Sequence, residues 1–195
     1  MLNPLPCATY AFVMSITPGP NNVMLTAAGA NFGLRRTVPH ILGVTAGFAA
    51  LVCAACGGLG VLFTRWPPVH IVLKWVGAAY LLFLGAQLLR SRGAAAGSAG
   101  EPITFWEAAA FQFLNPKAWI IALTAATLFL PPGLGQLPAI SYVATIVTLV
   151  NLPCITVWAL FGSSLGLLLT RPAARRIFNW AMAVGLGATG IMMVT

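Results

Sequence analysis

The stretch Ser15–Leu25, with the sequence SITPGPNNVML, interrupts a long apolar segment with two prolines and a glycine. Proline lacks a backbone N–H and its ring clashes with the preceding helical turn, so Pro18 and Pro20 remove two hydrogen bonds from any helix through this point. In lipid an unpaired backbone group is costly, and irregular backbone is tolerated only inside protein or along a water-filled cavity. Because proline suits the first position of a helix, we expect a break here and a half-helix that begins at Pro20.

A second break is expected at Asn115-Pro116-Lys117, where the sequence FLNPKAW again places a proline inside an apolar segment. Pro116 removes the bond to the Gln112 carbonyl, and we expect it to begin a half-helix in the same way. Pro153 stands alone and is typical of an ordinary proline kink.

The composition is that of an integral membrane protein. Of the 195 residues, 59% are hydrophobic and 6% are charged, whereas soluble domains carry about 25% charged residues. From Ala118 to Thr170, 53 consecutive residues include no Asp, Glu, Lys, Arg or His, which is room for two membrane spans of about 20 residues each. The net charge of +8 is explained by topology, since Lys and Arg gather in cytoplasmic loops, and we expect no nucleic-acid partner.

We therefore expect a single all-α integral membrane domain over residues 1–195, with six transmembrane helices. A cytoplasmic linker over residues 90–102, rich in Gly, Ala and Ser, separates a first half, 1–89, from a second half, 103–195. Three helices per half give the halves opposite orientations, so they form an inverted repeat in which helices 1 and 4 are broken. The similar segments LGVLFTR and LGLLLTR fit a duplication and equally a chance match. The expected spans are residues 8–32, 40–63, 69–89, 105–130, 138–168 and 177–195.

Basic residues predict the orientation of these spans. Seven arginines lie in or beside the first, third and fifth loops that connect the expected spans. On the opposite side there are only two basic residues, Arg65 and Lys74. Because Lys and Arg are enriched in cytoplasmic loops, we expect these three loops in the cytoplasm and both termini on the non-cytoplasmic side. The seven are Arg35, Arg36, Arg90, Arg92, Arg171, Arg175 and Arg176.

The two breaks predict a binding site for a negatively charged group. The start of a half-helix presents free N–H groups and the positive end of the helix dipole, which together bind carboxylates and other anions. Lys117 adds a charge that is costly at this depth and indicates function; the alternative is a lysine that extends to the interface. A cation at a helix start is also electrostatically misplaced unless an anion binds there. The expected substrate-binding residues are Pro18, Gly19, Pro20, Asn21, Asn22, Asn115, Pro116 and Lys117.

No metal site or cofactor is expected. Cys53 and Cys56 form a CxxC pattern, which elsewhere indicates redox or metal chemistry, but in an apolar helix without other ligands we interpret them as small apolar residues. The candidates for proton coupling are Glu107, His40 and Lys117. Glu107 and His40 lie near span ends, where a solvated interfacial role is the favoured alternative.

The motifs TPGPNN and NPKAW together make the chain resemble the lysine exporter (LysE/RhtB) family of small six-span amino-acid exporters. The resemblance runs over nearly the full length and includes GVTAGF in the second span and GAAYLLFLGAQLL in the third. It implies a secondary transporter in the inner membrane of a prokaryote that exports an amino acid or close derivative from the cytoplasm, driven by the proton gradient. The implied partners are the amino-acid substrate, the lipid bilayer and, as an option left open, a second copy in a homodimer.

Phe48 departs from the family pattern, because many relatives have an acidic residue just after the paired glycines of the second span. Without that acid there is little negative charge to hold a cationic substrate, so a neutral amino acid is favoured. Two other functions stay open: a channel or structural subunit of a membrane complex and, less favoured, a membrane-embedded enzyme. A pore usually needs rings of charge or a carbonyl filter, and an enzyme needs converging carboxylates, histidines or metal ligands.

Overall fold

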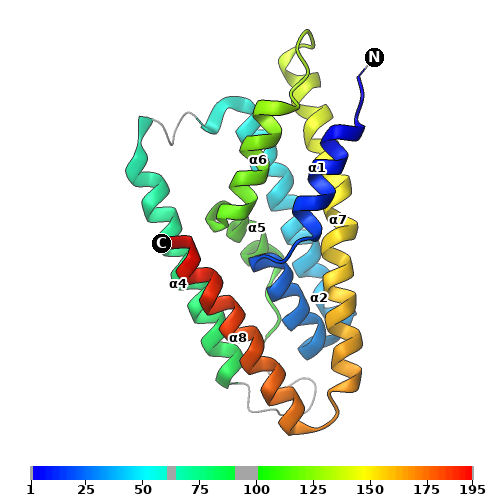
Figure 1. The fold of residues 1–195 in the computed structure, drawn as a ribbon, viewed down its shortest axis with the longest axis vertical. Coiled ribbons are helices and arrows are strands. Elements are labelled where there is room, and N and C mark those ends of the chain that lie inside the picture. The colour runs from blue at the N-terminus through cyan, green and yellow to red at the C-terminus, as the bar shows by residue number, and fades with distance from the viewer. Residues whose placement is uncertain (1, 61–64, 91–100, 195) are drawn as a thin grey trace.

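The protein is all-helical in its computed structural model, which describes residues 2–60, 65–90 and 101–194 (Figure 1). No strand occurs in these ranges. Most of the expected linker, residues 91–100, and the expected end of the second span, residues 61–63, lie outside them. The helices are α1 (Leu5–Ile16), α2 (Pro20–Ala54), the short π-helix η1 (Ala55–Leu59), α4 (Pro67–Arg90), α5 (Phe105–Leu114), α6 (Pro116–Leu128), α7 (Gln136–Leu168) and α8 (Pro172–Val194).

Both predicted breaks are confirmed. α1 ends at Ile16 and α2 begins at Pro20, with Gly19 extended between them (φ −173°, ψ 177°). α5 ends at Leu114 and α6 begins at Pro116, so that Asn115 alone separates them. Pro153 lies within α7, which continues through it without a break.

The long helix α2 consists of two antiparallel parts that meet at Gly33. This residue has φ 75° and ψ 164°, a conformation that glycine adopts without steric cost because it has no Cβ. Before the reversal Ala30 contacts Gly166 near the end of α7. After it the chain returns, so that Ala55 packs in one cluster with Val143 near the start of α7.

Two of the connections between helices are shorter in the structure than the sequence predicted. Residues 33–39 were expected to form a loop, but the helix resumes directly after Gly33 and includes Pro39. Pro39 is the sixth residue after Gly33 and lies beyond the four N–H groups that lack a partner at a helix start, so it removes the bond to the Arg35 carbonyl without ending the helix. The last helix likewise begins at Pro172 rather than at residue 177, since proline suits the first helical turn.

The two broken segments, α1–α2 and α5–α6, run in opposite directions through the molecule. Cys7 near the start of α1 shares a surface pocket with Leu128 and Pro131 at the end of α6. Deeper in the fold the breaks themselves meet, because Lys117 at the start of α6 bonds to Thr17 at the end of α1. Each break therefore lies beside the other, roughly midway along its own segment.

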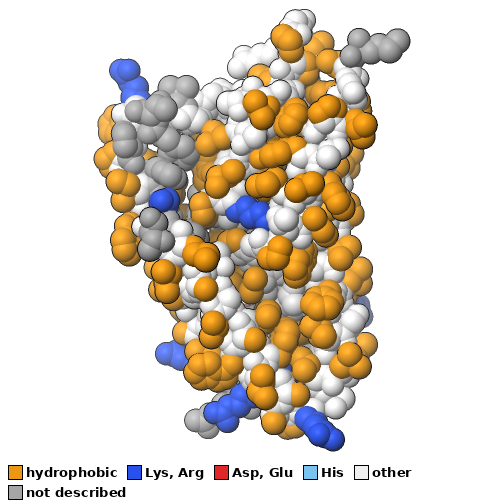
Figure 2. Space-filling view, in the orientation of Figure 1, with side chains coloured by type: hydrophobic (Ala, Val, Ile, Leu, Met, Phe, Trp, Pro, Cys, Tyr) orange, Lys and Arg blue, Asp and Glu red, His pale blue; other side chains and the backbone are white. Residues whose placement is uncertain are grey.

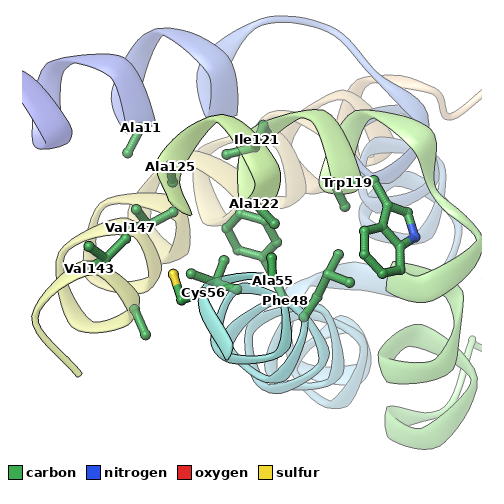
Figure 3. Packing of buried hydrophobic residues seen from close by; sticks show 14 of the residues in the cluster. Ala11, Phe48, Ala55, Cys56, Trp119, Ile121, Ala122, Ala125, Val143 and Val147 are labelled. Atoms are coloured by element: carbon green, nitrogen blue, oxygen red, sulfur yellow. The ribbon is translucent and has the colours of Figure 1, made fainter. Parts of the chain in front are cut away.

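The main core surrounds α6 (Figure 3). Ala122 and Ala125 of α6 face Ala11 of α1, Phe48 of α2 and Val147 of α7. Such small side chains let helix backbones approach closely. α4 and α8 instead pack mainly against each other and form a pair at one side of the molecule (Figure 1).

The surface is that of a membrane protein. Within the described residues three helical segments are long and apolar enough to cross a membrane: Pro20–Leu59, Ile71–Arg90 and Gln136–Leu168. α1 and α6 are apolar but shorter, because the breaks divide their segments. Figure 2 shows hydrophobic side chains spread over one face, with Lys and Arg at its lower end and a few more at its centre and upper left. An apolar surface this extensive requires lipid around it, so the chain crosses the membrane several times.

Candidate functional site

A small cavity lies where the two breaks meet. Its volume is about 30 Å³, which is room for about two water molecules. The starts of α2 and α6, the end of α1, and α7 form its walls. The lining residues are Met14, Ser15, Gly19, Pro20, Asn21, Asn22, Phe48, Asn115, Lys117, Ala118, Ile121, Asn151 and Ile155.

Six of the eight predicted binding residues line this cavity. The two that do not are Pro18 and Pro116, whose part is to interrupt the helices. At the start of α6 the Asn115 side chain accepts a hydrogen bond from the Lys117 backbone N–H at 3.1 Å and caps the helix. The structure thus brings the two half-helix starts together around one space.

The Lys117 side chain crosses this junction to the end of α1. Its Nζ donates to the Thr17 carbonyl oxygen at 2.7 Å, to the Thr17 Oγ1 at 2.9 Å and to the Pro18 carbonyl oxygen at 3.1 Å. The ammonium therefore has acceptors on α1 in this structure, although it also lies beside Gly19 at the start of α2. The Lys117 amine lies at the carbonyl end of α1, the negative end of that helix dipole, although its backbone starts α6.

The carbonyls at the end of α1 all receive hydrogen bonds. The last four carbonyls of a helix have no partner within it. Here the Val13 carbonyl accepts from the Thr17 N–H, the Met14 carbonyl from the Thr17 hydroxyl, the Ser15 carbonyl from Asn22 Nδ2 and the Ile16 carbonyl from Trp158 Nε1. The break is stable at membrane depth because other side chains replace the missing helical bonds.

A reciprocal amide pair joins the start of α2 to α5. Asn21 Nδ2 donates to Gln112 Oε1 at 2.8 Å, and Gln112 Nε2 donates back to Asn21 Oδ1 at 3.2 Å. Gln112 is fully buried. Sequence reasoning missed Gln112, and the only signal for it is an amide in the apolar second half of α5.

Asn151 of α7 forms the far wall of the cavity, and sequence reasoning missed it too. Its Nδ2 donates to Ser15 Oγ at 3.0 Å. Its Oδ1 is buried and has no hydrogen-bond partner in the described part of the chain. The available signal was a strongly polar amide within the 53-residue uncharged segment, since such groups in membrane helices are rare and often functional.

The three candidates for proton coupling lie in different places. Of them only Lys117 lines the cavity. Glu107 is exposed, as its interfacial interpretation expects, and its Oε2 accepts from the Thr104 N–H at 2.8 Å in a capping box that starts α5. For His40 a solvated role is wrong, because it is 0% exposed and neither ring nitrogen has a hydrogen-bond partner among the residues described.

No group of three or more His, Cys, Asp or Glu side chains gathers at any point of the described chain. Cys53 is exposed and Cys56 is buried, and both are free thiols. The lining of the cavity itself consists of amides, one hydroxyl, one amine and apolar groups.

A site between two half-helix starts, inside a helical membrane protein, is typical of secondary transporters. The family model described as "LysE type translocator" matches residues 12–195, so the chain belongs to the LysE type translocator family. This confirms the resemblance seen in the two proline motifs. The family consists of transporters and not of enzymes, so the chain is a transporter.

Several known relatives carry the same name, "Cysteine/O-acetylserine efflux protein". That of Klebsiella pneumoniae subsp. pneumoniae is 36% identical over 127 residues, which are 64% of this chain and 63% of that protein. That of Salmonella choleraesuis is 30% identical over 154 residues, or 79% of each protein, and that of Escherichia coli strain K12 is 29% identical over 155 residues, again 79% of each. The alignment with the Klebsiella protein thus spans less than two thirds of its length. No solved structure matches the chain.

Proposed function

We propose that this protein is a secondary transporter that exports small neutral amino acids, or close derivatives of them, from the cytoplasm. The observation that carries the proposal is the cavity that the starts of α2 and α6 share and that Lys117 also lines. The relatives named for efflux of cysteine and O-acetylserine support the same class of substrate, since both are small and have uncharged side chains.

The substrate carboxylate binds at the two half-helix starts. The first N–H groups of a helix lack intrahelical partners, and the residues that carry them here, Asn21 and Asn22 in α2 and Ala118 in α6, all line the cavity. Two converging positive dipole ends favour an anion at this point. Lys117 supplies the formal positive charge.

The cavity wall favours a neutral side chain. No Asp or Glu is among its lining residues, and Lys117 repels a second cation. Phe48, Ile121 and Ile155 make the remaining wall apolar, which suits a short uncharged side chain.

The directions of the helices support six crossings in two inverted halves. In this proposal α1 with residues 20–32 forms the first crossing, and α5 with α6 the oppositely directed fourth. The arginine-rich loops face the cytoplasm of the producing bacterium, and both termini lie on the non-cytoplasmic side of the membrane. Export is driven by the proton gradient, and Lys117 is the titratable group at the substrate site.

Amino-acid release tests this function. Cells that express the full chain are loaded with mixed peptides, so that internal amino acids rise, and every amino acid in the medium is measured. We expect faster release of small neutral amino acids, lost in Lys117→Ala and retained in the matched control Lys74→Ala, since Lys74 lies on α4 outside the cavity. Release should saturate and show counterflow, which a channel does not. Release equal to that of empty cells for every amino acid would refute the proposal.

A further inference from the structure

One polar atom of the cavity wall lacks a partner. Asn151 is 6% exposed, and its Oδ1 is buried without a hydrogen-bond donor in the described ranges. A buried acceptor left unpaired is costly. Among the buried side-chain atoms that lack a partner in the described ranges, only Asn151 Oδ1 belongs to a residue that lines the cavity. The unpaired atom therefore points to a donor that arrives with the substrate.

Four other acceptors around the cavity already receive hydrogen bonds. Asn21 Oδ1 accepts from Gln112, and Asn115 Oδ1 accepts from the Lys117 backbone N–H. Ser15 Oγ accepts from Asn151 itself, and the Ser15 carbonyl accepts from Asn22. Asn151 Oδ1 is held in place by the bond that Nδ2 of the same side chain donates to Ser15, and no donor from the described residues bonds to it.

We infer that Asn151, positioned by Ser15, is the subsite for the substrate ammonium and determines the charge selectivity of the transporter. This inference rests on the proposed function, which supplies the carboxylate end of the same substrate. An α-amino acid carries its ammonium and carboxylate on one carbon, so the two groups need neighbouring subsites in one cavity. Lys117 and Asn151 both line this cavity, from α6 and α7.

A neutral acceptor has a defined consequence for specificity. An amide oxygen binds an ammonium without adding charge. A zwitterionic substrate then meets one formally charged side chain among the described lining residues, that of Lys117. A second positive charge on the substrate would meet no counter-charge there. Replacing the amide with a carboxylate of the same shape supplies that counter-charge.

Counterflow in proteoliposomes of the full-length protein, with L-cysteine and L-lysine as probes, tests the inference. We expect Asn151→Asp to raise the ratio of lysine to cysteine transport at least about tenfold, equivalent to about 1.4 kcal/mol. We expect Asn151→Leu to lower cysteine transport by a similar factor. Thr148→Val is the matched control and should leave the ratio unchanged. The Thr148 hydroxyl on α7 is also buried without a partner among the described residues, but Thr148 does not line the cavity.

The wild-type protein gives a second test that requires no variant. 3-Mercaptopropionate equals cysteine without its ammonium, so we expect it to inhibit cysteine counterflow at least about tenfold less well than cysteine does. Equal inhibition, or an unchanged lysine-to-cysteine ratio in a folded Asn151→Asp protein, would overturn the subsite while leaving the transport function intact. Absence of transport of both probes by the wild type would instead overturn the proposed function, and the subsite with it.

Discussion

Gly162→Ala should destabilise the protein strongly, because α2 and α7 touch through their backbones. A Cβ at residue 162 would lie 2.1 Å from the Thr26 carbonyl oxygen, whereas ordinary contact begins near 3.4 Å. The helices would have to separate by about 1.3 Å, and they meet equally closely at Gly29 and Gly166. Overpacking costs about 1–3 kcal/mol, and rigid backbone places this case at the upper end. Alanine has a higher helix propensity than glycine and stabilises the helix by about 1 kcal/mol. The net loss in the free energy of unfolding is therefore about 2 kcal/mol.

The assay is thermal unfolding in detergent, with Gly187→Ala as the matched control. For a protein of this size 1 kcal/mol shifts Tm by about 2–4 °C, so Gly162→Ala should lower Tm by about 4–8 °C. A Cβ at residue 187 would find only the Leu82 Cδ2, at 3.8 Å, so the same substitution there should leave Tm unchanged or raise it by up to about 2–4 °C. Equal Tm values for the two variants would refute the backbone-contact reasoning.

Two further predictions concern polar groups near the site. Gln112→Leu removes the partner of the half-buried Asn21 amide and should cost about 0.5–1.5 kcal/mol, measured by thermal unfolding. Asn21→Leu added to it should cost less than the sum of the two single losses, and strict additivity would contradict the pairing. Glu107→Gln should keep both stability and the pH dependence of transport, because glutamine also completes a capping box with Thr104; a shifted pH profile would instead assign Glu107 to proton coupling.

The breaks were predictable from sequence because proline acts locally. Pro20 and Pro116 remove hydrogen bonds whatever surrounds them, so both half-helix starts follow from the chain alone. The partner of Lys117 was not predictable, because Thr17 and Pro18 lie about one hundred residues away and only the packing of the helices brings them close.

Other features depended on signals too weak to use in advance. Gln112 and Asn151 are single amides. Only the fold shows that Gln112 is paired, whereas Asn151 Oδ1 has no partner in the part of the chain that the structure describes. The reversal at Gly33 depends on the φ of one residue, whereas the neighbouring arginines and proline suggested a longer loop.

The size of the cavity bears on how such a transporter avoids leakage. At about 30 Å³ it holds water but not an amino acid, so in the proposed function it must widen for substrate to enter. The junction between the end of α1 and the start of α6 is one of its walls. Lys117 spans that junction with three hydrogen bonds. In the empty protein, separation would deprive its ammonium of these acceptors in a membrane interior, where unpaired polar groups are costly. In the proposed site the substrate carboxylate replaces those acceptors, so opening is favoured when an amino acid is present and disfavoured when the site is empty.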